Sequence, residues 1–291
     1  MKTIAVLTDF SKVAENAAKY AMHLAVHLNA NIKLYHSFFV ATEHPVSAGI
    51  VWPVENYKEL KLDSMRQLEL LGAELKKESS KKITDDFKPQ IECQSHEGDF
   101  TSFIKAIQEE KDLVLLVMGN HEENTRNWLK DNHVNNLMDK VSLPVLIISE
   151  DQKPMKIDKI AFATDLNMED VVKIHSLAGL ARAFHSEILV VHVVDGKYNE
   201  QELKEKEDEL LGAISSNLDF PKVYYRRIKS SDAEHGLDWF KTHGQIDMLV
   251  MVHRHHTFLQ ELFGGSVSKE MAKKVELPLL IYPVSSSVPF F

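Results

Sequence analysis

The sequence predicts an α/β fold of two tandem Rossmann-like domains, each a five-stranded parallel sheet with helices on both faces. The first observation is a repeat, since residues 4–9 (IAVLTD) return as residues 160–165 (IAFATD). The halves also end alike, with LPVLII at 143–148 and LPLLIY at 277–282. Finally, short apolar runs alternate with helical patterns in both halves, which is typical of parallel sheets. A repeat of this size indicates two domains of one fold, because solenoid repeats are far shorter.

The first half begins with an apolar run over residues 3–8 that is rich in β-branched side chains, as a strand buried on both faces requires. Ser11 can then cap a helix whose apolar residues recur at helical spacing. Strands are expected over residues 3–8, 32–38, 89–94, 113–118 and 144–149. Helices are expected over residues 12–28, 55–82, 100–110 and 126–140.

The second half repeats this order after a polar stretch, residues 150–156, which contains Pro154 and is the expected linker. The predicted domains are therefore 1–150 and 156–284. Strands are expected over residues 159–164, 188–194, 222–228, 248–252 and 278–282, and helices near 169–184, 201–217, 232–242 and 258–275. The halves differ most at residues 39–54, a long connection that is either a lid or binding loop or an ordinary surface insertion.

The last strand of each half is an apolar edge candidate. Pairing residues 144–149 with 278–282 would cover two exposed edges at once, so we expect the halves to form an internal pseudo-dimer. A further homodimer of the whole chain is left open.

Composition narrows the class of protein. The hydrophobic fraction of 44% and charged fraction of 26% are those of a globular chain, and the net charge of -9 argues against a nucleic-acid partner. The single cysteine, Cys93, lies in an apolar strand pattern, which favours a packed thiol in a reducing, cytoplasmic setting. We expect neither a signal peptide nor a membrane span, because no long uncharged apolar run is present.

Candidate ligand residues gather where parallel strands end. In an open parallel sheet, ligands bind outside the carboxyl ends of the strands, at the point where strand order reverses. Asp9 and Asp165 end the first strands, and the fourth strands lead into GNHE at 119–122 and VHRHH at 252–256. The second half continues to FGGSVS at 263–268, where backbone N–H groups and the hydroxyls of Ser266 and Ser268 suit a phosphate at a helix N-terminus.

These residues resemble the universal stress protein family, in tandem form. The opening KTIAVLTDFS at 2–11 is similar to that family's first strand and turn, and LYH at 34–36 and VVHV at 190–193 resemble its apolar-His-Val strand end. The resemblance implies ATP binding, with the first-strand aspartate and the residue after the strand-two histidine contacting adenine or ribose. A Gly-x2-Gly-x9-Gly-Ser/Thr loop would hold ribose and phosphates. In the second half the implied nucleotide contacts are Asp165, Val193, His255, Gly265, Ser266 and Val267.

The match is uneven between the halves. In the second half, Val252 and His255 stand at the first two glycine positions, although Arg254 and His255 would supply positive charge. The first half keeps Asp9 and Gly119 but has three departures: Ser37 for the valine, Glu122 for the second glycine and Asn132-His133 for Gly-Ser. A carboxylate at Glu122 would repel a phosphate. We therefore predict a degenerate first site and a partly kept nucleotide site in the second domain, with Asp9, Gly119, Arg254 and Ser268 as weaker candidates.

Two other functions remain open on the residues alone. The first is a metal site at His253, His255 and His256, which crowd one loop, although no cysteine or His-Glu-x-x-His pattern supports it. The second is an interaction or scaffold module without a small ligand, which the lost glycines favour. An enzyme is not expected beyond weak ATP hydrolysis, because no P-loop, nucleophile elbow or metalloprotease helix is present. Nucleotide or metal that co-purifies with the protein would discriminate among these functions.

Overall fold

The computed structural model describes residues 1–38, 55–82, 87–120, 137–138, 140–154, 156–194, 199–254 and 277–285. The residues of the 39–54 connection lie outside this part of the chain. So do residues 126–136 of one expected helix and the whole expected helix at 258–275.

Strands and helices alternate through the first half. It contains β1 (Thr3–Leu7), α1 (Lys12–Leu28), β2 (Asn31–Phe38), α2 (Glu55–Lys82), β3 (Ile91–Glu97), α3 (Phe100–Gln108), β4 (Leu113–Gly119) and β5 (Val145–Ile148). Ser11 caps α1 as expected, because its side chain accepts a hydrogen bond from the backbone N–H of Ala14, and Asn29 ends the helix in the left-handed conformation.

The second half has the same order of elements. It contains β6 (Lys159–Ala163), α5 (Asp170–Phe184), β7 (Glu187–Val194), α6 (Glu200–Asn217), β8 (Val223–Lys229), α7 (Ala233–His243), β9 (Met248–His253) and β10 (Leu279–Pro283). All ten expected strands are present, with ends shifted by a few residues. The predicted α/β fold with two related domains is confirmed.

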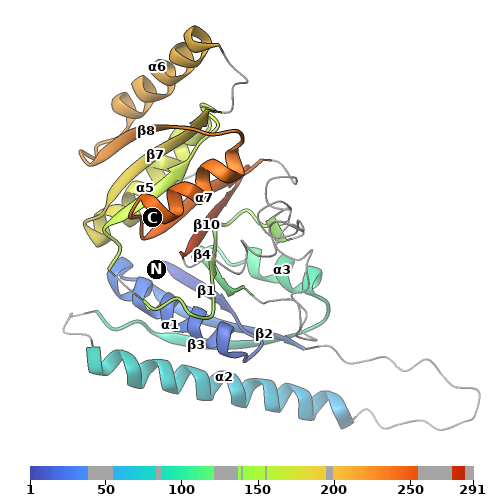
Figure 1. Ribbon diagram of the computed structural model, residues 1–291. Helices are drawn as coiled ribbons and strands as arrows, with labels where there is room; N and C mark the ends of the chain where they lie inside the picture. The colour runs from blue at the N-terminus through green and yellow to red at the C-terminus, as the bar shows by residue number, and fades with distance from the viewer. Residues whose placement is uncertain are drawn as a thin grey trace, which may run out of the picture.

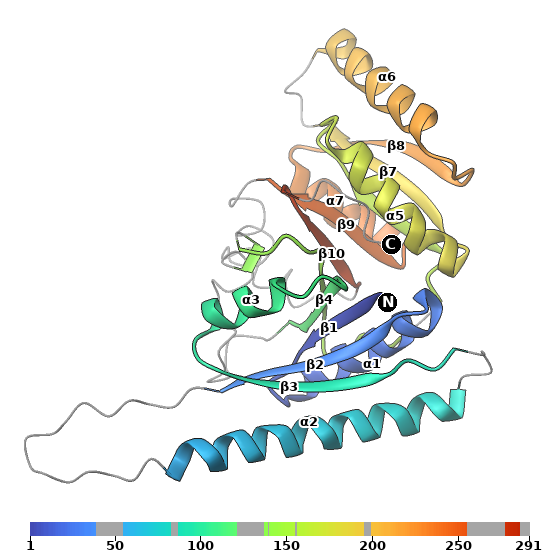
Figure 2. The same cartoon turned by 180° about the vertical axis from the view of Figure 1, so that it is seen from behind.

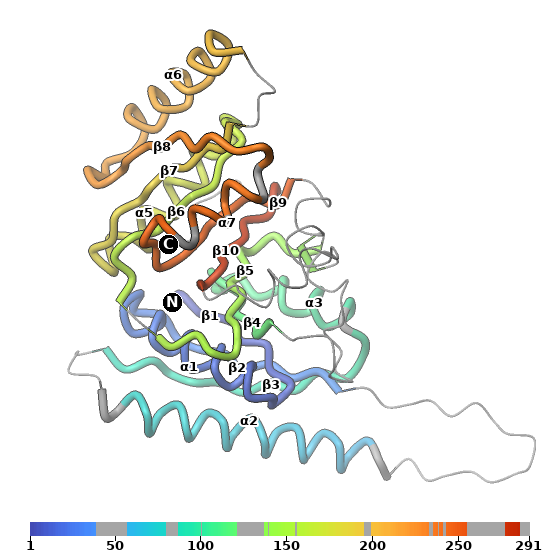
Figure 3. Tube along the Cα trace, viewed as in Figure 1, coloured from blue at the N-terminus to red at the C-terminus, as the bar shows by residue number. Residues whose placement is uncertain are grey.

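All ten strands form one sheet, in the order β3-β2-β1-β4-β5-β10-β9-β6-β7-β8. Within each half the neighbouring strands are parallel. At the centre, β5 and β10 are antiparallel, with Leu280 opposite Leu146. Figure 3 shows these two strands side by side, with the first half on one side of them and the second half on the other. The predicted pairing of the last strands is therefore confirmed.

Helices cover both faces of this sheet, over two separate apolar cores. One core takes side chains from α1, α2, α5 and α6, and the other takes them from α3 and α7. The two views agree, because α7 lies in front of the sheet in Figure 1 and α5 lies in front of it in Figure 2. On the face covered by α1, α2, α5 and α6, the halves also meet through α1 and α5. The His27 ring of α1 stacks on Phe184 of α5, with ring centroids 4.3 Å apart.

The segment between the halves is anchored on the first domain. The side-chain amide of Asn16 on α1 donates to the carbonyl oxygens of Ser149 and Gln152, at 2.9 and 2.6 Å. The Gln152 side chain is itself buried and accepts from the Ser149 N–H at 2.9 Å. The linker predicted from its polar composition is thus held by hydrogen bonds at its beginning.

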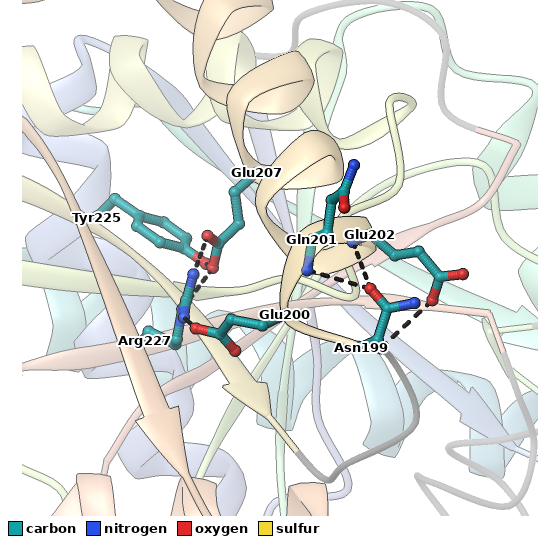
Figure 4. Close-up of polar contacts among 7 residues, drawn as sticks. All are labelled: Asn199, Glu200, Gln201, Glu202, Glu207, Tyr225 and Arg227. Carbon is teal, nitrogen blue, oxygen red and sulfur yellow. Dashed lines mark hydrogen bonds and ion pairs between the residues drawn. The ribbon is translucent and has the colours of Figure 1, made fainter.

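The outer edge of the second half is held by an ionic network between α6 and β8 (Figure 4). Glu207 is buried and accepts from the Tyr225 hydroxyl at 2.5 Å and from Arg227 Nε at 2.8 Å, while a second nitrogen of Arg227 contacts its other oxygen. Burial favours a higher pKa for Glu207, but the bonds from Arg227 and Tyr225 outweigh it and lower the pKa. Glu200 contacts the same guanidinium at 2.6 Å from a largely exposed position.

Replacing Arg227 by Ala should lower the free energy of unfolding by about 1–3 kcal/mol, because the buried Glu207 loses its cation. Urea unfolding measures this loss. Glu200→Gln is the matched control, and it should cost less than about 0.5 kcal/mol because that side chain is 76% exposed. A carboxyl with a lowered folded pKa adds stability above its unfolded pKa, so the loss caused by Arg227→Ala should shrink as acid protonates Glu207. Equal stability of the two variants would contradict this account.

Candidate functional site

The strand order places one topological switch point in each half. It lies between β1 and β4 in the first half and between β6 and β9 in the second. Asp9 follows β1 and Asp165 follows β6, so each aspartate lies at the carboxyl end of a strand that borders the switch point of its own half.

The turns that carry these aspartates are built alike. In each half a threonine after the first strand uses its Oγ1 to accept the N–H of the residue two positions on. The distance is 3.0 Å from Phe10 to Thr8 and 2.9 Å from Leu166 to Thr164. Phe10 and Leu166 both have left-handed backbones, with φ of 63° and 65°. The Thr-Asp repeat in the sequence is therefore a repeated turn that presents an aspartate.

A histidine from the second strand braces each turn. His36 Nδ1 lies 2.8 Å from the carbonyl oxygen of Thr8, and His192 Nδ1 lies 2.9 Å from that of Thr164. A carbonyl oxygen only accepts, so Nδ1 carries the proton in both contacts. The pKa of His36 is lowered mainly by burial, which favours this neutral form. The histidines that mark the family resemblance, His36 and His192, thus hold the two strand-end turns by hydrogen bonds to their threonine carbonyls.

The two aspartates then differ in their contacts. Asp9 Oδ1 accepts the N–H of Ser11 at 3.0 Å, within its own turn. Asp165 Oδ1 instead accepts from Arg254 Nη1 at 2.8 Å, across the switch point from the residue that follows β9. The structure therefore brings Asp165 and Arg254 together, although 89 positions separate them.

Arg254 also contacts a second carboxylate, that of Asp170 in the first turn of α5. The other oxygen of Asp170 accepts from Thr164 Oγ1 at 2.6 Å. Asp170 is completely buried, whereas the side chain of Asp165 is 54% exposed and that of Arg254 is 12% exposed. Burial raises the pKa of Asp170 even though Arg254 and Thr164 both act to lower it.

Lys173, a buried cation, lies on α5 together with Asp170. Lys173 donates to the carbonyl oxygen of Val284 at 3.2 Å, just after β10. Burial lowers its pKa, while the charges of Glu169 and Asp170 oppose that shift. The sequence analysis missed Asp170 and Lys173, because residues inside a helical pattern look like ordinary helix positions. The available signal was an ionisable pair on a helix whose other buried positions are apolar except for Ser176.

The glycine positions can be compared through sheet register. Gly119 lies beside Ile148, and Val252 lies beside Tyr282, which is the corresponding residue of the other last strand. A Cβ at Gly119 would come 2.6 Å from a side-chain carbon of Val13, so close packing of α1 accounts for this glycine without a ligand. Whether Gly119 also contacts a ligand stays a prediction.

The structure describes some of the predicted site residues, and the others lie outside the described part of the chain. Val193 lies near the end of β7, beside Gly236 of α7. A Cβ added at Gly236 would come 2.5 Å from a side-chain carbon of Val193. The remaining predicted nucleotide contacts, His255, Gly265, Ser266, Val267 and Ser268, lie outside the described residues, as does His256. His253, the third residue of the metal alternative, is buried at the end of β9. Among the described residues, no three His, Cys, Asp or Glu side chains form a group suited to a metal ion.

Two further expectations can be compared with the structure. Cys93 is partly buried, and burial raises the pKa of its thiol, which agrees with a packed rather than a reactive cysteine. Among the helices that the structure describes, none is both long and apolar enough to span a bilayer.

This geometry defines a class of protein: two parallel α/β domains of one kind, joined through their last strands, with a topological switch point in each. The chain belongs to the universal stress protein family, whose sequence profile matches residues 1–149 and 156–283.

Solved structures share the fold across the whole chain. A universal stress protein from Archaeoglobus fulgidus DSM 4304 is similar over 97% of this chain and 98% of its own, with 13% identity and a TM-score of 0.65. A putative universal stress protein from Pseudomonas aeruginosa UCBPP-PA14 is similar over 97% and 93%, with 14% identity and a TM-score of 0.53. The cytoplasmic domain of a prokaryotic cation chloride cotransporter is similar over 99% and 98%, with 9% identity and a TM-score of 0.54. At these identities the likeness shows the fold and not the ligand. No curated protein matches the chain.

Proposed function

We propose that this chain is a cytoplasmic stress-response protein that binds ATP or a related nucleotide-like ligand in its second domain. The observation that carries the proposal is the position of Asp165. Its carboxylate reaches across the β6/β9 switch point to Arg254 and remains half exposed. An exposed carboxylate at a switch point suits the hydroxyl or amino donors of a nucleoside.

The proposed contacts extend from Asp165 to both sides of the crevice. Val193 stands near the end of the neighbouring strand β7, where the family resemblance puts a contact to adenine or ribose. His255, Gly265, Ser266 and Val267 complete the proposed set, with Arg254 and Ser268 as weaker members. Asp9 and Gly119 would form the corresponding, weaker site of the first domain.

Titration calorimetry with ATP and with adenosine tests this assignment. Asp165→Ala should weaken binding by about tenfold or more, because a hydrogen bond to a charged group is lost, and Asp165→Asn should show the same direction. Asp9→Ala is the matched control in the first domain and should leave binding nearly unchanged. Equal losses in the Asp165 and Asp9 variants would overturn the assignment to the second domain.

The same titrations separate the alternatives. A protein that binds neither ligand with or without zinc would act as an interaction or scaffold module. Stoichiometric zinc binding that His253→Ala abolishes would instead favour the metal site.

A further inference from the structure

The guanidinium of Arg254 is held between two carboxylates with very different surroundings. Asp165 lies at the mouth of the crevice with 54% of its side chain exposed, whereas Asp170 has no exposed surface. An exposed ion pair adds little stability and exchanges readily, while a buried one cannot be broken without leaving an unpaired charge in the protein interior. The contact to Asp165 is therefore the one that a ligand can replace.

The buried contact keeps Arg254 in place during such an exchange. Asp170 is itself fixed, because its second oxygen accepts from Thr164 Oγ1 at 2.6 Å. Thr164 is in turn part of the strand-end turn that carries Asp165. A chain of contacts from Thr164 through Asp170 thus sets the position of the guanidinium at the switch point.

Arg254 also retains unused donor capacity. Its Nε atom is buried and has no hydrogen-bond partner among the residues that the structure describes. A buried N–H without an acceptor is unfavourable, so an oxygen supplied by a ligand would be stabilised there. A planar guanidinium matches phosphate oxygens especially well.

This arrangement is absent from the corresponding described positions of the first half. Ile4 of β1 and Ile160 of β6 occupy corresponding positions in the two halves. Counting forward from them, Ala14 corresponds to Asp170. An alanine offers no carboxylate to hold a cation at that point. The buried pairing of Arg254 with Asp170 is therefore a feature of the second domain and not of the repeated fold.

We propose that Arg254 contacts an anionic phosphate of the second-domain ligand, and that Asp170 is the residue that positions it. The inference rests on the proposed function and narrows it to phosphorylated nucleosides. Ligand hydroxyls donate to Asp165, which frees Nη1 of Arg254. A phosphate oxygen then accepts from Nη1 in place of Asp165. The carboxylates of Asp165 and Asp170 contact Arg254, and Glu169 lies close enough to act on the neighbouring Lys173, so a phosphate without hydroxyls for Asp165 would bind weakly.

The test is calorimetric titration of the full chain with adenosine, ATP and inorganic pyrophosphate. The wild-type protein should bind ATP at least about tenfold more tightly than adenosine. In an Arg254→Gln/Asp170→Asn double variant, which removes both charges of the pair, this preference for ATP should fall by about threefold or more. Arg254→Lys keeps the charge but lacks Nε and the planar fork, so the preference for ATP should fall between these values. Lys12→Gln removes an exposed cation at the start of α1 and should leave the preference unchanged.

The outcomes separate this inference from the proposed function. An unchanged ATP preference in the double variant would overturn the role of Arg254 while nucleotide binding stands. A protein that binds pyrophosphate through Arg254 but neither nucleotide nor nucleoside would retain the anion contact and overturn the proposed function. Binding of none of the three would overturn both.

Discussion

The two halves, produced as separate polypeptides of residues 1–150 and 156–291, should associate with each other or aggregate instead of remaining monomeric. In the whole chain, β5 and β10 pair at the centre of the sheet, with Leu146 and Leu280 each 1% exposed. Separation would turn both strands into apolar edges with unpaired backbone groups. Full exposure of one such side chain costs about 1.5–3 kcal/mol, and several line this seam.

Size-exclusion chromatography with light scattering on each half and on their mixture measures this association. A Leu280→Asp substitution in the second half should abolish it, because a carboxylate would be buried at the seam. Leu70→Asp in the first half is the matched control, since Leu70 lies on α2 with 62% exposure. Two soluble, monomeric halves that do not interact would show that the seam adds little to the stability of either domain.

Arg254→Ala should lower the free energy of unfolding by about 3–5 kcal/mol, because it leaves the buried carboxylate of Asp170 without a cation. Adding Asp170→Asn to this variant should restore part of the loss, since the amide carries no charge. Urea unfolding of the wild type, both single variants and the double variant forms a double-mutant cycle for the pair. Additive losses would show that the two residues are not coupled.

The pH dependence of Arg254→Ala should have the same sign as that of Arg227→Ala, because each variant removes the cation from a carboxylate. Burial already raises the pKa of Asp170, and removing Arg254 takes away an interaction that lowers it. A carboxyl whose folded pKa lies above its unfolded value destabilises the folded protein when it ionises. The stability of Arg254→Ala relative to wild type should therefore improve as pH falls through the raised pKa of Asp170 in the variant. It should level off below the folded pKa of Asp170 in the wild type, because the unfolded state is common to both proteins. A relative stability that did not change with pH would contradict this.

Local patterns in the sequence were enough to predict the fold. Apolar runs such as residues 3–8 predict buried strands because the signal lies in consecutive side chains, and Ser11 predicts a helix start because a cap acts over three residues. The Thr-Asp repeat predicted that an aspartate follows the first strand of each half, and the histidines of the second strands marked the family resemblance. The seam between β5 and β10 also followed from sequence, since each half ends in an apolar strand with no further strand to cover it.

The contacts that distinguish the two crevices depended on tertiary structure. Asp165 was predicted from the repeat, but its partner Arg254 lies 89 positions away and was a weaker candidate, valued only for its charge. Asp170 was missed, although it is the buried residue that holds Arg254. The close approach of Val13 to Gly119 was not visible in the sequence, and a ligand contact at Gly119 stays a prediction.

The division between these two kinds of result has one physical cause. Strand and helix periodicity, capping and strand-end turns arise from residues that are neighbours along the chain, so the sequence by itself determined the α/β fold, the repeat and the place of each crevice. Burial and ion pairing depend on which distant elements the folded sheet brings together. Folding places Asp170 out of water beside Thr164 and Arg254, and that desolvation makes Arg254 a fixed cation at the second switch point. The chemistry of the crevice was therefore decided only by the tertiary structure.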